Sequence, residues 1–216
     1  MNDTFSITIG RELGSGGKAI AKILADHFGC TFYDKQILTL AAKESGFSEK
    51  LFEEHDERHG RLPGILFNKV PIIGHANYYS EQVSAGSLFK FQSEVIWHEA
   101  KDHRCVFVGR CADYVLRKKA DKVNIFIYAN MDFKIRNVVE REGCSSDEAR
   151  RKIIEGERKR NEFYNFYTGQ KWGDKQYYDL CIDSSVLGID KSATLLIQYI
   201  NQLLELSEPS ELSEPS

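Results

Sequence analysis

The amino-acid sequence predicts a three-layer α/β fold, in which a five-stranded parallel sheet carries helices on both faces. Short apolar, β-branched runs alternate along the chain with longer segments of helical periodicity, which is typical of parallel sheets. Hydrophobic residues make up 42% and charged residues 28% of the 216 residues, a globular balance that excludes general disorder. The length suits one domain of ordinary size.

The first unit of the predicted fold is a strand, a glycine loop and a helix. Phe5–Ile9 is a short apolar run typical of a buried strand, and Gly10–Gly17 contains four glycines in eight residues. A helix follows, with apolar residues at helical spacing up to Phe28 and a stop at Gly29. The ligands of such sheets bind at the carboxyl ends of the strands, so the glycine loop is the first candidate site.

The later elements continue the alternation. Strands are predicted at Cys30–Tyr33, Cys105–Val108, Val123–Tyr128 and Tyr178–Ile182. Helices are predicted at Gln36–Glu44, Ser48–Arg58, Ala85–Lys101, Ala112–Lys118, Asp132–Glu142, Ser145–Phe166 and Asp190–Leu204. Ser145 or Ser146 is the expected amino-terminal cap of the helix that follows Gly143, with Glu148 in its first turn.

The predicted domain covers residues 1–204. The last twelve residues read ELSEPS twice, and we expect this tail, 205–216, to be disordered. Residues 61–80 are the least regular part of the domain, with two of the four prolines and two glycines. We interpret them as either a flap over a bound acceptor or a surface for a homodimer.

Charge, hydropathy and cysteine use exclude several classes of protein. Lys plus Arg is 29 against 32 Asp plus Glu, so a net charge of −3 argues against a nucleic-acid partner held by bulk charge. No run approaches the roughly 18 apolar residues of a membrane span, and the first residues do not read as a signal peptide. Five scattered cysteines without a CxxC pair predict reduced thiols, a cytoplasmic location and no zinc site.

The glycine loop predicts phosphate binding. Backbone N–H groups of a glycine loop and of a helix start converge on a phosphate, and Lys18 would reach its outer oxygens. A standard phosphate loop reads GxxxxGK followed by Ser or Thr. Here Gly17-Lys18 is present, whereas Glu12 stands at the first glycine position and Ala19 at the hydroxyl position.

That missing hydroxyl bears on the metal that phosphoryl transfer uses. Mg²⁺ is normally held by the Ser or Thr and by an acid on another strand. Ser15 is the hydroxyl that the loop contains. The alternatives for Mg²⁺ are water and phosphate oxygens, or the carboxylates of Glu12, Asp34 and Asp113.

A basic run, SDEARRKIIEGERKR, occupies the helix after Ser145. Arg151 and Arg158 are seven residues apart and share a helix face, whereas Arg158 and Arg160 do not. One interpretation is a solvated face with Glu–Arg pairs. The other is a set of arginines that covers a transferring phosphoryl group.

Arg110 and Asp113 follow the third strand at a glycine. At this position Arg110 could hold a second anion. Asp113 could either fix the Arg110 guanidinium or accept a hydrogen bond from an amino group of a base. The alternative is an ion pair that caps the short helix beginning at Ala112.

Five segments together resemble the cytidylate kinase-like family, in the branch whose loop reads GSGG, from about Ser6 to Ile200. They are ITIGRELGSGGKAIAKILA, FYDKQIL, VFVGRCADYVLR, EGERKRNEFYNFYTGQKWGD and YDLCIDSSVLGID. The resemblance implies a phosphate-loop (P-loop) nucleoside-monophosphate-kinase-like fold with a mobile helical lid at about 145–175. It also implies ATP and Mg²⁺ as cofactors and phosphorylation of a nucleoside monophosphate.

The resemblance also implies roles for single residues. The ATP phosphates fall on Gly14, Ser15, Gly16, Gly17 and Lys18. The acceptor falls on Asp34, Arg110 and Arg136, and the lid arginines, catalytic together with Lys18, are Arg158 and Arg160. The chain departs from the Gly-Arg-Asp motif at Cys111, with Asp113 displaced by two residues, and from the lid motif at Lys159 and Asn161.

Three hypotheses follow. The first is a kinase that phosphorylates a CMP- or dCMP-like nucleotide or a similar small phosphorylated acceptor. The second is a non-catalytic nucleotide sensor on the same fold, which Glu12, Ala19 and the altered Gly-Arg-Asp motif favour. The third is a protein scaffold, which would show no nucleotide-dependent thermal shift.

Overall fold

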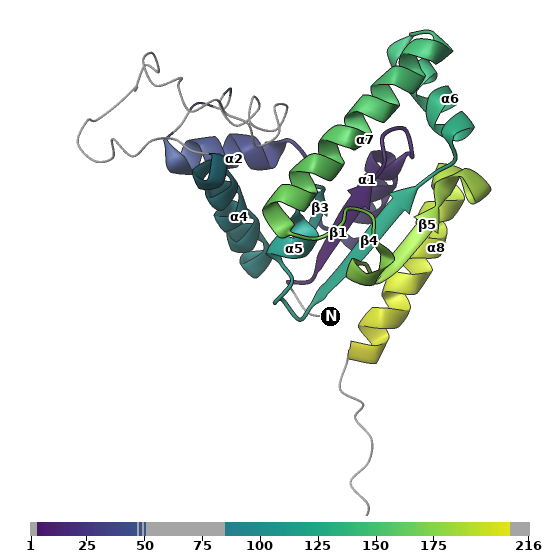
Figure 1. The fold of residues 1–216 in the computed structure, drawn as a ribbon. Coiled ribbons are helices and arrows are strands. Elements are labelled where there is room, and N and C mark those ends of the chain that lie inside the picture. The colour runs from purple at the N-terminus through teal and green to yellow at the C-terminus, as the bar shows by residue number, and fades with distance from the viewer. Residues whose placement is uncertain (1–3, 47, 49, 51–84, 208–216) are drawn as a thin grey trace, which may run out of the picture.

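Five parallel strands form the sheet of the described part of the chain, in the order β2-β3-β1-β4-β5 (Figure 1). The computed structural model describes residues 4–46, 48, 50 and 85–207. The strands are β1 Ser6–Arg11, β2 Thr31–Tyr33, β3 Cys105–Val108, β4 Lys122–Tyr128 and β5 Leu180–Asp183.

The strand β1 lies at the centre of the sheet. Its Ser6 is level with Cys105 of β3 on one side and with Lys122 of β4 on the other. Ile7 and Ile9 are almost completely buried, as expected for a strand covered on both faces. The chain leaving β1 therefore emerges between the carboxyl ends of two neighbouring strands.

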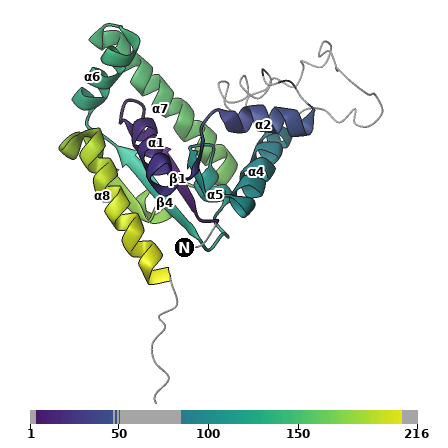
Figure 2. The same ribbon diagram turned by 180° about the vertical axis from the view of Figure 1, so that it is seen from behind.

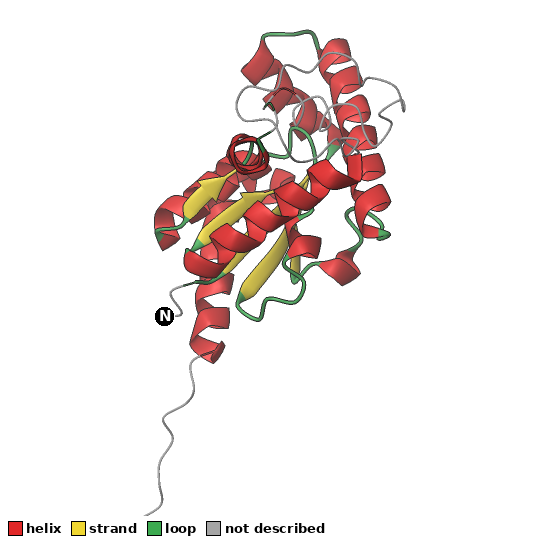
Figure 3. Cartoon of the chain, turned by 90° about the vertical axis from the view of Figure 1, so that its left-hand side faces the viewer, coloured by secondary structure: helices red, strands yellow, loops and turns green. Residues whose placement is uncertain are grey.

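The helices form layers on the two faces of the sheet (Figure 3). The helices α1 (Gly17–Phe28) and α8 (Ser184–Ser207) cover one face (Figure 2), and α7 (Ser146–Thr168) crosses the other. Beside β2 and β3, α2 (Gln36–Ser45) packs on α4 (Ala85–Asp102). The remaining helical elements are α5 Ala112–Val115, α6 Met131–Glu142 and a 3-10 turn at Lys175–Tyr177.

The two faces of the sheet have separate apolar cores. On the α1 and α8 face, Leu24 and Leu196 are fully buried against the central strands. On the α2 and α4 side, Leu88 and Phe107 are buried in a second cluster. Each fully buried side chain of this size contributes about 1.5–3 kcal/mol, so both layers stabilise the sheet that carries the site.

The structure confirms the predicted five-stranded parallel sheet and shifts some boundaries. Ser145 is the cap of α7, since its hydroxyl accepts from the N–H of Glu148. The closing helix begins six residues earlier than expected, at Ser184, and turns at Gly188, where φ is 76°. It ends at Ser207, whereas the predicted domain ended at 204.

Some predictions lie outside the described residues. They are the irregular segment 61–80, almost all of the helix at 48–58, and most of the repeat tail. No helix in the described part of the chain is both long enough and apolar enough to cross a membrane.

Candidate active site

A pocket of about 880 Å³ opens at the carboxyl ends of the central strands. Its walls come from the glycine loop between β1 and α1, the end of β2, the turn after β3, and the inward faces of α6 and α7. Among the described residues, eight lysine or arginine side chains and four carboxylates line it. The pocket is therefore positively charged inside a chain whose net charge is −3.

The glycine loop has a backbone that only glycine adopts easily. Gly14 and Gly16 have φ of 83° and 76°. A Cβ on Gly14 would lie 2.6 Å from the carbonyl oxygen of Lys134, and a Cβ on Gly16 would lie 2.6 Å from Ile189. The helix α1 begins at Gly17, so its first N–H groups, which have no partner within the helix, lie at the pocket.

Ser15 faces away from the pocket, unlike its neighbours in the loop. Its side chain is fully buried and donates to the carbonyl of Glu12 at 2.9 Å. Its own carbonyl accepts from the hydroxyl of Ser184 at 2.6 Å. Ser15 was predicted to contact phosphate. Its hydroxyl lies on the side of the loop away from the pocket, where it stabilises the loop backbone.

Lys18 and Asp34 form an ion pair across the pocket. The Lys18 ammonium lies 2.8 Å from a carboxylate oxygen of Asp34, and the Arg11 guanidinium lies 3.8 Å from the other oxygen. Burial alone would raise the pKa of Asp34, but Lys18 and Arg11 outweigh it and hold the pKa below its usual value. The fold thus pairs Lys18, which was predicted to bind ATP, with Asp34, which was predicted to bind the acceptor.

Three arginines meet beside this pair: Arg11 at the end of β1, Arg110 after β3, and Arg160 on α7. The guanidinium of Arg160 donates to the carbonyl of Arg11 at 2.9 Å. The Arg11 side chain lies against Gly109, where any Cβ would overlap its guanidinium. A side chain at 109 would therefore displace the Arg11 guanidinium, and the φ of 73° at this position favours glycine as well.

The turn that presents Arg110 has an unusual backbone. Gly109, Arg110 and Cys111 all have positive φ, of 73°, 62° and 55°. Residues other than glycine rarely adopt this region, at a cost of about 1–3 kcal/mol each. The side chain of Gln92 on α4 supports the turn by donating to the carbonyl of Arg110 at 3.2 Å.

The three arginines raise the positive potential of the pocket. The pKa of Arg110 is lowered to about 10 and that of Arg160 to about 9, chiefly by burial and then by the neighbouring Arg11. Asp34 opposes these shifts. The positive charges of these guanidinium groups repel one another in a half-buried part of the pocket. A bound anion would reduce this repulsion, so the site favours an anion.

Two predicted arginines lie outside the pocket. Arg158 is exposed and pairs with Glu155 at 2.8 Å and Glu162 at 2.6 Å. It lies two residues before Arg160, about 200° around the helix, so both cannot face the pocket. Arg136 is also exposed, with its guanidinium 5.9 Å from the ring of Phe133. Neither side chain lines the pocket, so the structure does not bring Arg136 and Arg158 together with the other predicted site residues.

An aromatic recess continues the pocket beneath α7. Its floor holds Asp113, whose buried carboxyl accepts from the Tyr164 hydroxyl at 2.6 Å. Burial raises the pKa of Asp113, although the Tyr164 hydroxyl opposes the shift. Trp172 and Tyr178 line the same recess, and the buried Tyr178 hydroxyl makes no hydrogen bond of normal geometry within the described residues.

The model of the "Cytidylate kinase-like family" matches residues 6–186. The chain belongs to this family. A curated cytidylate kinase from Methanopyrus kandleri is 27% identical over 94% of this chain and 96% of that protein. Another, from Pyrococcus abyssi, is 30% identical over 83% of this chain and 84% of that protein. The protein is a kinase.

Solved structures agree with this family's fold. An uncharacterised protein from Eubacterium ventriosum has a TM-score of 0.66 and 27% identity, covering 91% of this chain and 98% of that one. A shikimate kinase from Bacteroides thetaiotaomicron has a TM-score of 0.51 at 13% identity, with the same coverage of both chains. The second likeness shows the fold alone, a three-layer P-loop architecture.

The kinase offers few protein ligands for Mg²⁺. Within the described residues no group of three His, Cys, Asp or Glu side chains could hold a metal ion. The three carboxylates considered from the sequence are engaged: Glu12 by Lys134, Asp34 by Lys18, and Asp113 by Tyr164.

Sequence reasoning missed several residues of the kinase pocket. Arg11 lies within the glycine-rich segment, and nothing in that segment indicates a binding role for an arginine. Only the fold shows that it lies close to Arg110. Lys134 is one basic residue in a charged helix, yet its side chain is only 6% exposed. A signal was present: Lys134 and Val138 are four apart, on the helix face that becomes buried.

Proposed function

We propose that this kinase transfers a phosphoryl group from ATP to a nucleoside monophosphate, CMP- or dCMP-like, or to a similar small phosphorylated acceptor. One observation carries the proposal. The glycine loop with Lys18 and the cluster of Arg11, Arg110 and Arg160 line a single pocket, in which Lys18 and Arg11 reach the same carboxylate of Asp34. Two phosphate-binding elements in one pocket suit a reaction between two phosphates.

ATP is assigned to the glycine loop. The N–H groups around Gly14, Gly16 and Gly17 would hold its phosphates, and Lys18 would move from Asp34 to the outer phosphate. Mg²⁺ bound to the phosphate oxygens would neutralise charge during transfer. Because the nearby carboxylates are engaged, the metal is expected to be held chiefly by phosphate and water.

The acceptor is assigned to the arginine side of the pocket. Arg110 would hold its phosphate, and Asp34, which Lys18 would leave when ATP binds, stays beside the Arg11 guanidinium at 3.8 Å. No general base is needed, since a phosphate oxygen is already ionised. The recess with Asp113 and Tyr178 would receive the remainder of the acceptor, with polar groups for an amino group or a ring nitrogen.

Arg160 is assigned to the transferring group. It projects from α7 toward the loop, and the carbonyl of Arg11 fixes its guanidinium. A guanidinium placed there stabilises charge that spreads over the equatorial oxygens.

A non-catalytic nucleotide sensor is the second candidate. Ala19 lacks the hydroxyl that holds a metal, and the Ser15 hydroxyl is turned away from the pocket. Such a protein would bind ATP without transferring phosphate to an acceptor.

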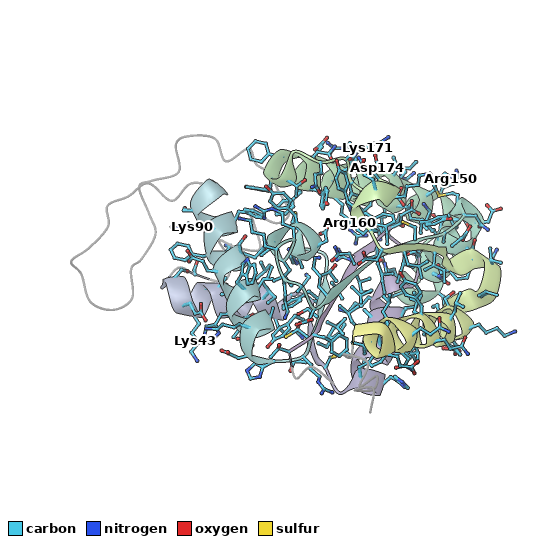
Figure 4. The ribbon with its side chains drawn as sticks, turned by 90° about the horizontal axis from the view of Figure 1, so that it is seen from below. Lys43, Lys90, Arg150, Arg160, Lys171 and Asp174 are labelled. Carbon is cyan, nitrogen blue, oxygen red and sulfur yellow. The ribbon has the colours of Figure 1, made fainter. Side chains whose placement is uncertain are left out.

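A coupled assay of ADP release tests the proposal. CMP, dCMP, UMP, AMP and small phosphorylated metabolites are offered with MgATP. We expect acceptor-dependent release that Lys18→Ala lowers by about 10²-fold or more. Lys43→Ala, on the outer helix α2 (Figure 4), is the control and should leave the rate unchanged. Binding of ATP with no acceptor-dependent release from any of these compounds would favour the sensor.

A further inference from the structure

Glu12 replaces the first glycine of a standard phosphate loop, and the structure shows what it does there. Its carboxylate turns toward α6, where one oxygen accepts from the Lys134 ammonium at 2.9 Å and from the N–H of Ala129 at 3.2 Å. Lys134 also contacts Glu157 on α7, at 2.7 Å. We call Glu12, Lys134 and Glu157 the loop–helix bridge.

The bridge is well shielded from solvent. The Lys134 side chain is 6% exposed and each glutamate side chain 23%. Burial alone would lower the pKa of Lys134, but its hydrogen bonds to Glu157 and Glu12 outweigh this and raise it. A lysine buried between two carboxylates stays charged, and removal of the ammonium would leave two acids facing one another.

Neighbouring contacts tie the same stretch of chain to both helices. The side chain of Asn137 on α6 donates to the carbonyl of Gly14 at 2.8 Å. On α7, a Cβ at Gly156 would lie 3.0 Å from Leu13, so the helix backbone approaches the loop closely. The loop is therefore clamped from two sides, with the bridge between them.

The bridge also bears on Arg160. Glu157 and Arg160 are three residues apart on α7 and share a helix face. The contact of Glu157 with Lys134 therefore limits both the rotation of α7 and its height above the loop. Lys134 is not among the described residues that line the pocket, so it does not touch a ligand there.

We propose that Lys134 is a positioning residue, which couples the phosphate loop to α7 through Glu12 and Glu157 and so places Arg160 for transfer. This inference rests on the proposed function. In this proposal Glu12 anchors the phosphate loop of an active enzyme. Its presence at the first glycine position is then not a sign of lost activity. The coupling predicts that a nucleotide on the loop steadies α7 only while the bridge is intact.

Lys134→Met tests this role, and Lys152→Met is the matched control. Lys152 also joins two glutamates, Glu142 on α6 at 2.9 Å and Glu148 on α7 at 3.0 Å, but its side chain is 42% exposed. Both variants remove one ammonium between the same two helices. Only the first touches the phosphate loop.

Two measurements are made on the full chain. The first is kcat and KM with MgATP and the best acceptor. We expect Lys134→Met to lower kcat by about 10- to 100-fold, the scale of a misplacement near 1 Å, while KM for the acceptor changes little. The second is amide hydrogen exchange of α7 with and without ATP and without acceptor. ATP should protect α7 in the wild type and in Lys152→Met, but not in Lys134→Met.

The exchange measurement separates this inference from the proposed function. Protection by ATP that depends on Lys134, without turnover of any acceptor offered, would support the coupling and overturn the proposed acceptor class. Equal protection and equal kcat in both lysine variants would overturn the coupling whatever the acceptor is.

If Lys134→Met does not fold, Glu157→Gln takes its place, because it keeps the size and hydrogen bonding of the side chain. Unchanged protection and kcat in that variant would overturn the coupling.

Discussion

The two faces of α7 carry similar charges and have opposite environments. On the outward face, Arg158 lies in solvent between Glu155 and Glu162. On the inward face, Arg160 reaches into the pocket and contacts the backbone of Arg11. Arg150, nearer the start of the helix, is also exposed (Figure 4).

The difference shows that the basic residues of one run along a helix do not share one function. Exposed pairs at helical spacing contribute little and are screened by salt. A guanidinium in a positively charged, half-buried wall gains from any anion that enters. The position of a residue around the helix therefore decides whether its charge is available to a ligand.

The largest effect expected from this comparison is on turnover. Arg160→Met should lower kcat by about 10²- to 10³-fold, since it removes the cation assigned to the transferring phosphate. The fold should persist, because the change also relieves repulsion among three neighbouring arginines. Steady-state kinetics with MgATP, together with circular dichroism, check both points, and a kcat within threefold of wild type would contradict the assignment.

A smaller effect is expected on ligand-linked stability. Inorganic pyrophosphate at about 100 times its Kd should stabilise the wild type by about 2.7 kcal/mol, by mass action. That corresponds to a rise in Tm of about 5–10 °C for a domain of this size. Thermal shift at one fixed pyrophosphate concentration should give a clearly smaller rise in Arg160→Met and a full rise in Arg158→Met. Equal rises in both variants would place the anion elsewhere.

A further test concerns Asp113, the buried acid on α5 that accepts from the hydroxyl of Tyr164, one helical turn beyond Arg160 on α7. The pKa of Asp113 is raised by burial, so its charged form costs stability in the folded state, and this cost grows as pH rises through that pKa. Asp113→Asn should therefore raise Tm at pH 8, by about 2–4 °C if it relieves about 1 kcal/mol. The gain should shrink as pH falls through that pKa. A gain that is independent of pH would show that the charge of Asp113 is not its cause.

The smallest effect belongs to the outward face. Arg158→Met should leave kcat and KM within about twofold of wild type and Tm nearly unchanged, since both of its partners are exposed glutamates. Kinetics in parallel with Arg160→Met measure the contrast directly. A large loss in Arg158→Met would mean that α7 rotates during the reaction and brings its outward face to the phosphates.

Much of the fold could be predicted from local patterns. The strand runs, the glycine stops and the Ser145 cap are set by neighbours in sequence, and the structure confirms them. The start of α8 could not be read in this way, because Gly188 interrupts the helical pattern and hides the first turn after Ser184.

The site was predictable only in part. Asp34 and Arg110 closely follow strands, and Lys18 lies in the first turn of the helix after β1, so the parallel topology brings all three to the same edge of the sheet. Arg11 and Lys134 matter because of partners about a hundred residues away in sequence, which no local pattern encodes. Helix geometry predicted that Arg158 and Arg160 do not share a face, and only the structure shows that Arg160 is the one that lines the pocket.

The contacts behind the glycine loop bear on the order in which the site is completed during synthesis. The loop is made well before the residues that support it, because the Ser184 hydroxyl binds its Ser15 carbonyl, and Ile189 packs against its Gly16. At about 5–20 residues per second, the ribosome needs roughly 9–34 s to travel from the loop to these partners. A nascent chain therefore carries the glycine loop for many seconds before its contacts with α8 can form.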